Sequence, residues 1–278
     1  DLAVGVSETK EGKFHLPRAQ ADVEAFSQAL SDAAGQPEDE LLLSLLNPSK
    51  DQFTEALQTV ATKGEGLLVL YFSGHAVQEP STGSASLICF DSNPQVPATL
   101  LAGELIGEIL NQATGSSLLL VLDCCYAEDV ASQISRKLSW KVSGSVILSA
   151  CMSRTQAIQP ACLTQISEGY ASNLSAFTRS LVLGLRGICQ EDPSIPISPA
   201  RLSELAYYEA ARLHGSRPTL TQVGIARHLS VKKRSPGEAQ FSLTQRGFLS
   251  GFGKAAENTT PETIALHGSE GACPLAYA

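Results

Sequence analysis

Leu67–His75, with the sequence LLVLYFSGH, and Ser117–Cys125, with the sequence SLLLVLDCC, are the two stretches that decide the fold. Each is an apolar run of strand length that ends at a reactive side chain. A continuous apolar run is typical of a strand buried on both faces, as in a parallel sheet. In open parallel sheets, ligands and chemistry collect beyond the carboxyl ends of the strands. We therefore expect His75 and Cys125 to emerge at the same edge of one sheet.

An imidazole and a thiol at such an edge can act on one substrate carbonyl. If the two strands are neighbours, their backbones lie about 4.8 Å apart. The thiolate is the attacking species, and a nearby histidine can serve as general base and later as general acid. His75 and Cys125 are therefore the predicted base and nucleophile of a cysteine hydrolase. The alternative for either residue is an ordinary structural role, which is the usual fate of a free cysteine.

Cys124 provides an internal comparison for the nucleophile. Side chains alternate along an extended segment, so Cys124 and Cys125 point in opposite directions and only one of them can face His75. The other histidines do not follow an apolar strand, and we interpret them as ordinary residues: His15, His214, His228 and His267.

The two motifs, Tyr71–His75 (YFSGH) and Leu122–Cys125 (LDCC), resemble the caspase-like cysteine peptidases, in particular the metacaspase, orthocaspase and bacterial caspase-like branches. His75 and Cys125 are 50 residues apart (125 − 75), and a spacing of this size is known for caspases. The resemblance implies an α/β fold, namely a three-layer α/β/α sandwich. Its sheet would have six mostly parallel strands, with the last strand antiparallel.

The resemblance covers roughly residues 1–231, which we expect to form the peptidase domain. Residues 232–278 are expected to be a linker and a C-terminal extension of unknown role. Alternating strand and helix patterns with short links agree with a mainly parallel sheet and right-handed crossovers.

Local composition gives further expectations for single segments. We interpret Asn173 as the N-cap of a helix and the apolar stretch 226–231 as the last strand of the sheet. Three stretches are interpreted as loops: 76–85, 126–143 and 153–173.

The resemblance also assigns the oxyanion site. Backbone N–H groups of Cys125 and Ala76 would hold the developing negative charge. The family usually has Gly at the position of Ala76, and Ala keeps the donor but disfavours a positive φ. Tyr126-Ala127 is a second departure, because many relatives have His-Ser-Gly there.

Three residues match the S1 pocket that receives Arg or Lys in metacaspase-like enzymes: Asp22, Ser73 and Asp123. Asp123 precedes Cys125 by two positions, on the same side of an extended backbone. A buried carboxylate pair is costly without a cation, which a basic P1 residue would supply. The alternatives are a strand-end or turn role for Asp123 and a helix N-terminal charge for Asp22.

The sequence therefore predicts a cysteine endopeptidase that cleaves protein or peptide substrates after Arg or Lys. By resemblance it would be a regulated protease of programmed cell death or defence. One alternative is a pseudoprotease that binds peptides or scaffolds a complex, which the Ala76 and Tyr126 departures motivate. Another is a self-processing regulatory domain. Autoprocessing is expected after a basic residue of the polar segments: Arg136, Lys137, Lys141, Arg154 or the Lys232-Lys233-Arg234 linker.

Composition narrows the class of protein. A net charge of −8 argues against nucleic acid as a partner, and no apolar run approaches the roughly 20 residues of a membrane span. Seven cysteines without a Cys-x-x-Cys pair indicate a reducing, cytoplasmic location. We expect no metal or other cofactor: some metacaspases bind calcium, but no dense acidic cluster here points to a site. The chain opens inside a strand, so an upstream regulatory domain or activator is left open.

Overall fold

The computed structural model describes residues 1–35, 42–63, 66–79, 82–139, 142, 144–151, 173–186, 201–207 and 218–224. Its centre is a six-stranded sheet of order β2-β1-β3-β7-β8-β9. Every neighbouring pair is parallel except β8 and β9, which are antiparallel. This confirms the predicted sheet. The strands are β1 (Leu2–Gly5), β2 (Leu43–Leu46), β3 (Leu67–Ser73), β7 (Ser117–Asp123), β8 (Gly144–Ser149) and β9 (Thr219–Gly224).

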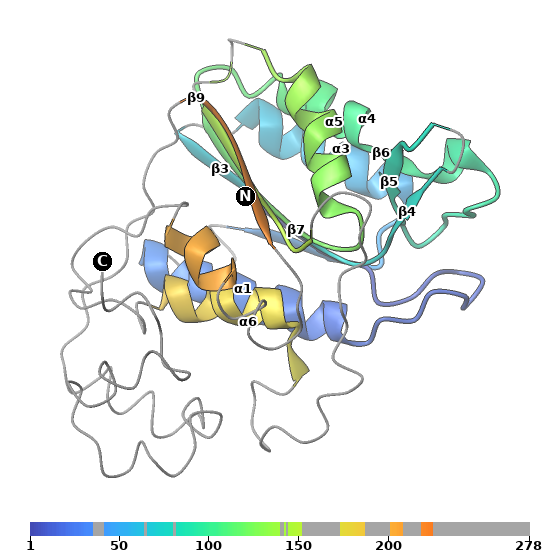
Figure 1. The fold of residues 1–278 in the computed structure, drawn as a ribbon, viewed down its shortest axis with the longest axis horizontal. Helices are drawn as coiled ribbons and strands as arrows, with labels where there is room; N and C mark the ends of the chain where they lie inside the picture. The colour runs from blue at the N-terminus through green and yellow to red at the C-terminus, as the bar shows by residue number, and fades with distance from the viewer. Residues whose placement is uncertain are drawn as a thin grey trace.

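Helices cover both faces of the sheet, which gives the three layers of the sandwich (Figure 1). One face carries α1 (Arg18–Ala34), α6 (Ala176–Leu185) and the helical residues 201–207. The other carries α3 (Lys50–Lys63), α4 (Gly103–Leu110) and α5 (Ala127–Lys137).

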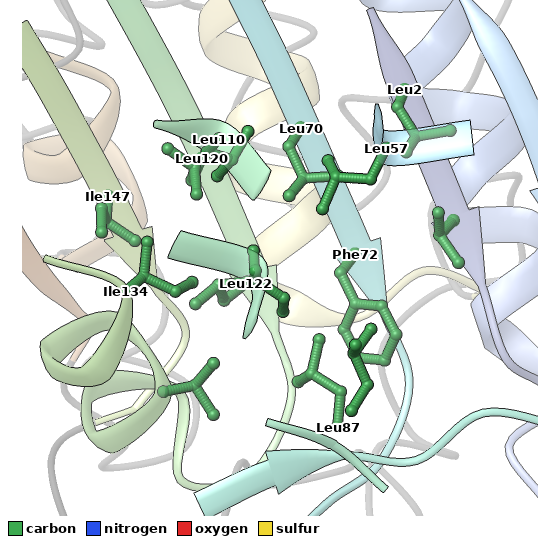
Figure 2. Close-up of a cluster of buried hydrophobic side chains, with 14 of the residues drawn as sticks. Leu2, Leu57, Leu70, Phe72, Leu87, Leu110, Leu120, Leu122, Ile134 and Ile147 are labelled. Atoms are coloured by element: carbon green, nitrogen blue, oxygen red, sulfur yellow. The ribbon is translucent and has the colours of Figure 1, made fainter. Parts of the chain in front are cut away.

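Alternation along β3 and β7 divides the core into two clusters. Leu70 and Phe72 of β3, with Leu120 and Leu122 of β7, pack toward α3, α4 and α5 (Figure 2). The residues between them, such as Val121, pack toward α1 and α6. Fully burying one such side chain contributes about 1.5–3 kcal/mol. The same alternation puts Asp123 and Cys124 on opposite faces where β7 ends.

A small antiparallel sheet lies beside α4 and α5, formed by β4 (Ala76–Gln78), β5 (Ala85–Leu87) and β6 (Leu101–Ala102). The interpretation of 76–85 as a loop is therefore wrong for β4 and for Ala85. Ala76 and Leu87 are cross-strand partners, and both are buried in the core cluster beneath α4 and α5. Packing of this kind, which local composition does not reveal, stabilises such short strands.

The interpretation of 126–143 as a loop is also wrong, because residues 127–137 form α5. Its polar composition hid an apolar stripe of Ala127, Val130, Ala131 and Ile134, which recur at helical spacing and are all buried. Acidic residues lie in the first turn of α5 and basic residues in the last, which suits the helix dipole.

Two further expectations need correction. The antiparallel partner of β8 is Thr219–Gly224, which pairs along the whole of β8, so the last strand of the sheet lies earlier than predicted. Residues 226–231 lie outside the described residues. The N-cap of α6 is Ser175, not Asn173, because the Ser175 side chain accepts a hydrogen bond from the N–H of Thr178. The predicted loop 153–173 lies outside the described residues except for Asn173.

Candidate active site

The carboxyl ends of β3 and β7 meet at one edge of the sheet. The strands are neighbours, and Ser73 lies directly opposite Asp123 in their parallel register. The N–H of Gly74 donates to the Asp123 carbonyl at 3.2 Å, which continues the pairing beyond the strands. His75 and Cys125 each follow two residues after this last pair, so both emerge at the edge where they were expected.

The two adjacent cysteines have different surroundings. Cys125 is partly exposed, whereas Cys124 is buried in the core cluster on the α3–α5 side. The Cys151 thiol donates to the Cys124 carbonyl at 3.3 Å. Burial raises the pKa of the Cys124 thiol well above its ordinary value, and the neighbouring Cys151, Cys125 and Asp123 raise it further. Of the pair, Cys125 is the cysteine that a substrate can approach.

Cys125 lies in a sharp turn between β7 and α5. The next residue, Tyr126, has a left-handed backbone conformation with φ 54° and ψ 25°, and it is the N-cap of α5. The first N–H groups of a helix favour negative charge nearby. The turn therefore places Cys125 at a helix N-terminus, a position suited to a thiolate.

His75 is half-buried, and the ring of Phe14 packs against its imidazole with ring centroids 5.3 Å apart. Burial lowers the pKa of His75 from its ordinary value of 6.5. The imidazole is then neutral near pH 7, as a general base must be. Its Nε2 atom is buried and has no hydrogen-bond partner among the described residues. A buried unsatisfied atom needs an explanation, and a catalytic role is one such explanation.

The backbone at Ala76 is extended, because this residue begins β4. The N–H of Ile88 donates to the His75 carbonyl at 2.9 Å. In an antiparallel ladder hydrogen-bonded pairs alternate with non-bonded ones, so the N–H of Ala76 points away from β5. Among the described residues, only Asn47 and Tyr126 have a positive φ without being glycine. Alanine in place of the family's glycine therefore causes no backbone strain at residue 76.

The structure brings Asp22, Ser73 and Asp123 together on the α1–α6 side of this edge. Ser73 Oγ donates to Asp22 Oδ2 at 3.0 Å, and only 1% of Asp22 and 7% of Asp123 is exposed. Gly5 permits this approach, since a Cβ on it would lie 2.8 Å from the Ala19 carbonyl oxygen of α1.

The N-terminus of α6 completes the cluster with two residues that sequence reasoning missed. Ser175 Oγ and Thr178 Oγ1 both donate to Asp123 Oδ2, the latter at 2.7 Å. The N–H of Ser175 donates to Asp22 Oδ1 at 2.8 Å. The one sequence signal was a serine in N-cap position, which the choice of Asn173 as the cap overlooked.

Burial disfavours the charged form of both carboxyl groups. Burial raises the pKa of Asp22 well above its ordinary range, the charge of Asp123 raises it further, and the hydrogen bonds from Ser175 and Ser73 oppose the rise. Burial also raises the pKa of Asp123, against the hydrogen bonds from Ser175 and Thr178. Without a cation, the two groups therefore do not both ionise readily.

Within the described ranges, no group of three or more His, Cys, Asp or Glu side chains is arranged to hold a metal ion. No helix in this part of the chain is both long and apolar enough to span a membrane.

A mostly parallel α/β sheet with histidine and cysteine at the ends of adjacent strands is the arrangement expected of a caspase-like cysteine peptidase. The chain belongs to the caspase domain family, whose sequence model matches residues 2–246. It is thus of the cysteine-type peptidase class, which acts on proteins.

The fold is similar to that of caspase-1 from Spodoptera frugiperda, with a TM-score of 0.51 and 10% sequence identity. The match covers 84% of this chain and 90% of that chain, and at this identity the likeness concerns the fold alone. No curated protein sequence matches the chain significantly.

Proposed function

We propose that this chain is an endopeptidase in which His75 and Cys125 form the catalytic dyad, and that it cleaves after Arg or Lys. The observation that carries the proposal is the edge shared by β3 and β7. At this edge Ser73 and Asp123 are direct partners, and His75 and Cys125 each lie two residues beyond them. Asp22 accepts a hydrogen bond from Ser73.

In this mechanism His75 accepts the proton of the Cys125 thiol, and the thiolate attacks the peptide carbonyl carbon. The N–H groups of Cys125 and Ala76 stabilise the oxyanion. His75 then protonates the leaving amine, and the C–N bond breaks to leave a thioester on Cys125. His75 next deprotonates a water molecule, which attacks the thioester carbon. The C–S bond then breaks, the acid product leaves, and the proton on His75 returns to the Cys125 sulfur.

Substrate selection follows from the two carboxyl groups. An Arg guanidinium at P1 can form bidentate hydrogen bonds with a carboxylate, which Lys cannot. An Asp at P1 would add a negative charge beside two buried acids. Such a contact costs several kcal/mol, roughly a thousandfold in rate. We therefore expect Arg to be preferred over Lys, and Asp to be essentially inactive.

The test is a scan of fluorogenic peptides that differ only at P1, run on the wild type, Cys125→Ala, His75→Ala and Cys124→Ala. Hydrolysis should be abolished in the first two variants. Cys124→Ala is the matched control and should keep most of it, because Cys124 is buried in the core. An active Cys125→Ala variant, or cleavage after Asp by the wild type, would contradict the proposal.

The surroundings of the site weaken the pseudoprotease alternative. Ala76 is extended, so its difference from the family's glycine leaves the oxyanion donor in place. A peptidase-dead chain would not be alkylated selectively at Cys125 by a thiol-directed inhibitor carrying Arg at P1, whereas the proposed enzyme would be.

By family resemblance we assign the chain to regulated cell death or defence in the cytoplasm, with a peptidase domain over 1–231 and an extension over 232–278. For self-cleavage, Arg136 and Lys137 are poor sites because they lie in the last turn of α5, and proteases bind extended segments. Mass spectrometry of the purified chain should instead find any cut after Lys141, Arg154 or Lys232–Arg234.

A further inference from the structure

Three hydroxyl side chains, which we call the hydroxyl network, converge on Asp123: Tyr71, Ser175 and Thr178. Ser175 and Thr178 contact Asp123 Oδ2 directly, and the Tyr71 hydroxyl contacts Thr178 Oγ1. Tyr71 and Thr178 are completely buried. The network joins β3, β7 and α6 at a point that the dyad chemistry does not use.

With Asp123 ionised, the direction of each hydrogen bond follows, because a hydroxyl group has one hydrogen. Thr178 gives its hydrogen to Asp123, so the bond between Tyr71 and Thr178 must use the hydrogen of Tyr71. Ser175 also gives its hydrogen to Asp123, while its oxygen accepts the N–H of Thr178 at 2.9 Å. Two donated hydrogens on one carboxyl oxygen favour the ionised form of Asp123.

Asp22 is held differently. It receives the backbone N–H of Ser175 at 2.8 Å and contacts the single hydroxyl of Ser73 at 3.0 Å. That hydroxyl contact can also run in reverse, with a protonated Asp22 as donor and Ser73 Oγ as acceptor. Asp22 can therefore hold a proton without losing a partner.

We propose that the hydroxyl network makes Asp123 the anion of the S1 pocket, with Asp22 as its proton-holding partner, so that Ser175 and Thr178 are specificity-positioning residues. This inference rests on the proposed function, since it concerns how that pocket recognises Arg. An empty pocket then carries one buried negative charge, and one P1 cation neutralises it. Burial raises the pKa of both acids, but the charge of Asp123 raises that of Asp22 further, whereas the two hydroxyls oppose the rise at Asp123.

The test compares kcat/KM for two substrates, one with Arg at P1 and one with citrulline, its uncharged isostere. Thr178→Val and Ser175→Ala should each lower the Arg-to-citrulline ratio about tenfold, the effect of losing one hydrogen bond to a charged group. Thr178→Ser should restore the ratio. The matched control is Ser180→Ala, a buried serine of α6 whose hydroxyl donates to the Ala176 carbonyl at 2.7 Å, and it should keep the ratio.

The acids themselves give a second comparison. Asp123→Asn removes the proposed anion and should lose most of the Arg preference. Asp22→Asn imitates a protonated acid and should keep the larger share of the preference for Arg.

A pH profile separates positioning from a purely structural role. The other titratable and charged groups that interact electrostatically with the two acids are Arg18 of α1, Tyr71 of β3 and Cys124 after β7. Removing a hydroxyl donor raises the pKa of Asp123, and only its ionised form binds Arg. The acidic limb of kcat/KM for Arg should therefore move to higher pH in Thr178→Val, while the limb for citrulline stays in place.

The possible outcomes distinguish this inference from the proposed function. A wild type that hydrolyses neither substrate, or shows no preference for Arg, contradicts the proposed function and this inference with it. A wild type that prefers Arg while Thr178→Val and Ser175→Ala keep that preference contradicts only the hydroxyl network. An equal loss of the preference for Arg in Asp22→Asn and Asp123→Asn also contradicts only the hydroxyl network. If Thr178→Val does not fold, Ser175→Ala decides the question, and an unchanged Arg-to-citrulline ratio in that variant contradicts the hydroxyl network.

Discussion

The imidazole of His75 owes its low pKa to burial, and Phe14 is an aromatic side chain in contact with it. Phe14→Ala would let water reach the ring. The pKa of His75 should then rise toward its ordinary value of 6.5, and the acidic limb of hydrolysis of a neutral P1 substrate should move up with it. An NMR titration of the His75 ring protons measures the first effect directly. Phe14→Leu, which keeps an apolar cover, is the control, and a pKa that falls in Phe14→Ala would refute this account.

Tyr126 stores backbone strain directly after Cys125, the proposed nucleophile, since a non-glycine residue with a φ of 54° is unfavourable. The left-handed region costs an ordinary residue about 1–2 kcal/mol, and glycine does not incur this cost. Tyr126→Gly should therefore be about 1 kcal/mol more stable than Tyr126→Ala in urea unfolding. Both variants lose the same ring, so the comparison isolates the backbone. An alanine variant equal to or more stable than the glycine variant would show that the turn relaxes without strain.

At the scale of single residues, the sequence predicts features that depend on neighbouring positions in the chain. Alternation along one strand predicts that Cys124 and Cys125 point in opposite directions, and in the structure Cys124 is buried and Cys125 is partly exposed. Phe14 could not be predicted, because it meets His75 from a loop 61 residues away in sequence (75 − 14). Ser175 likewise reaches Asp123 across 52 residues, and no short-range pattern encodes such a contact.

At the scale of elements, the close approach of α1 to β1 sets the position of Asp22. A Cβ at Gly5 would meet the Ala19 carbonyl oxygen at 2.8 Å and Val23 Cγ2 at 2.9 Å, so Gly5→Ala must push α1 outward. We expect a loss of about 1–3 kcal/mol in the free energy of unfolding, typical of overpacking. We also expect a lower preference for Arg at P1, because Asp22 moves with the helix. Urea unfolding and the fluorogenic peptide scan measure the two effects.

Gly107→Ala is the matched control for this prediction. A Cβ there would lie 2.7 Å from the Ile134 carbonyl oxygen of α5, a clash of the same kind on the opposite face of the sheet. It should destabilise the fold similarly but leave the P1 preference alone. Equal changes in P1 preference from both variants would mean that the effect is general loosening and not displacement of α1.

The elements also show where periodicity suffices for prediction. The continuous apolar runs of β3 and β7 were predicted correctly, because strands buried on both faces must be apolar throughout. Only one stripe of α5 is buried, so its composition resembled a loop although Ala127, Val130 and Ile134 recur at helical spacing. The three-residue strand β4 is too short for any period to appear.

At the scale of the whole molecule, the buried acid pair makes stability depend on pH. The pKa of Asp22 is raised in the folded protein, so the folded state binds more protons than the unfolded state above the ordinary carboxyl value of 3.8. The favourable contribution of Asp22 to the free energy of unfolding is complete below the pKa that Asp22 has in the unfolded chain. It is lost as the pH rises through the pKa that Asp22 has in the folded protein. The slope is at most about 1.4 kcal/mol per pH unit for one proton.

Asp22→Asn should remove this dependence, because asparagine carries no charge in either state and its carbonyl oxygen can still accept the N–H of Ser175. The variant should therefore melt at a higher temperature than the wild type at pH 8, and the gain in Tm should shrink as the pH falls toward 4. Calorimetry at a series of pH values measures it. Asp51→Asn, on the exposed surface of α3, is the control for loss of one surface carboxylate and should show no gain that grows with pH. A gain for Asp22→Asn that is largest at low pH would mean that Asp22 is a stabilising anion in the folded protein, and the assignment of Asp123 as the pocket's charge would fail with it.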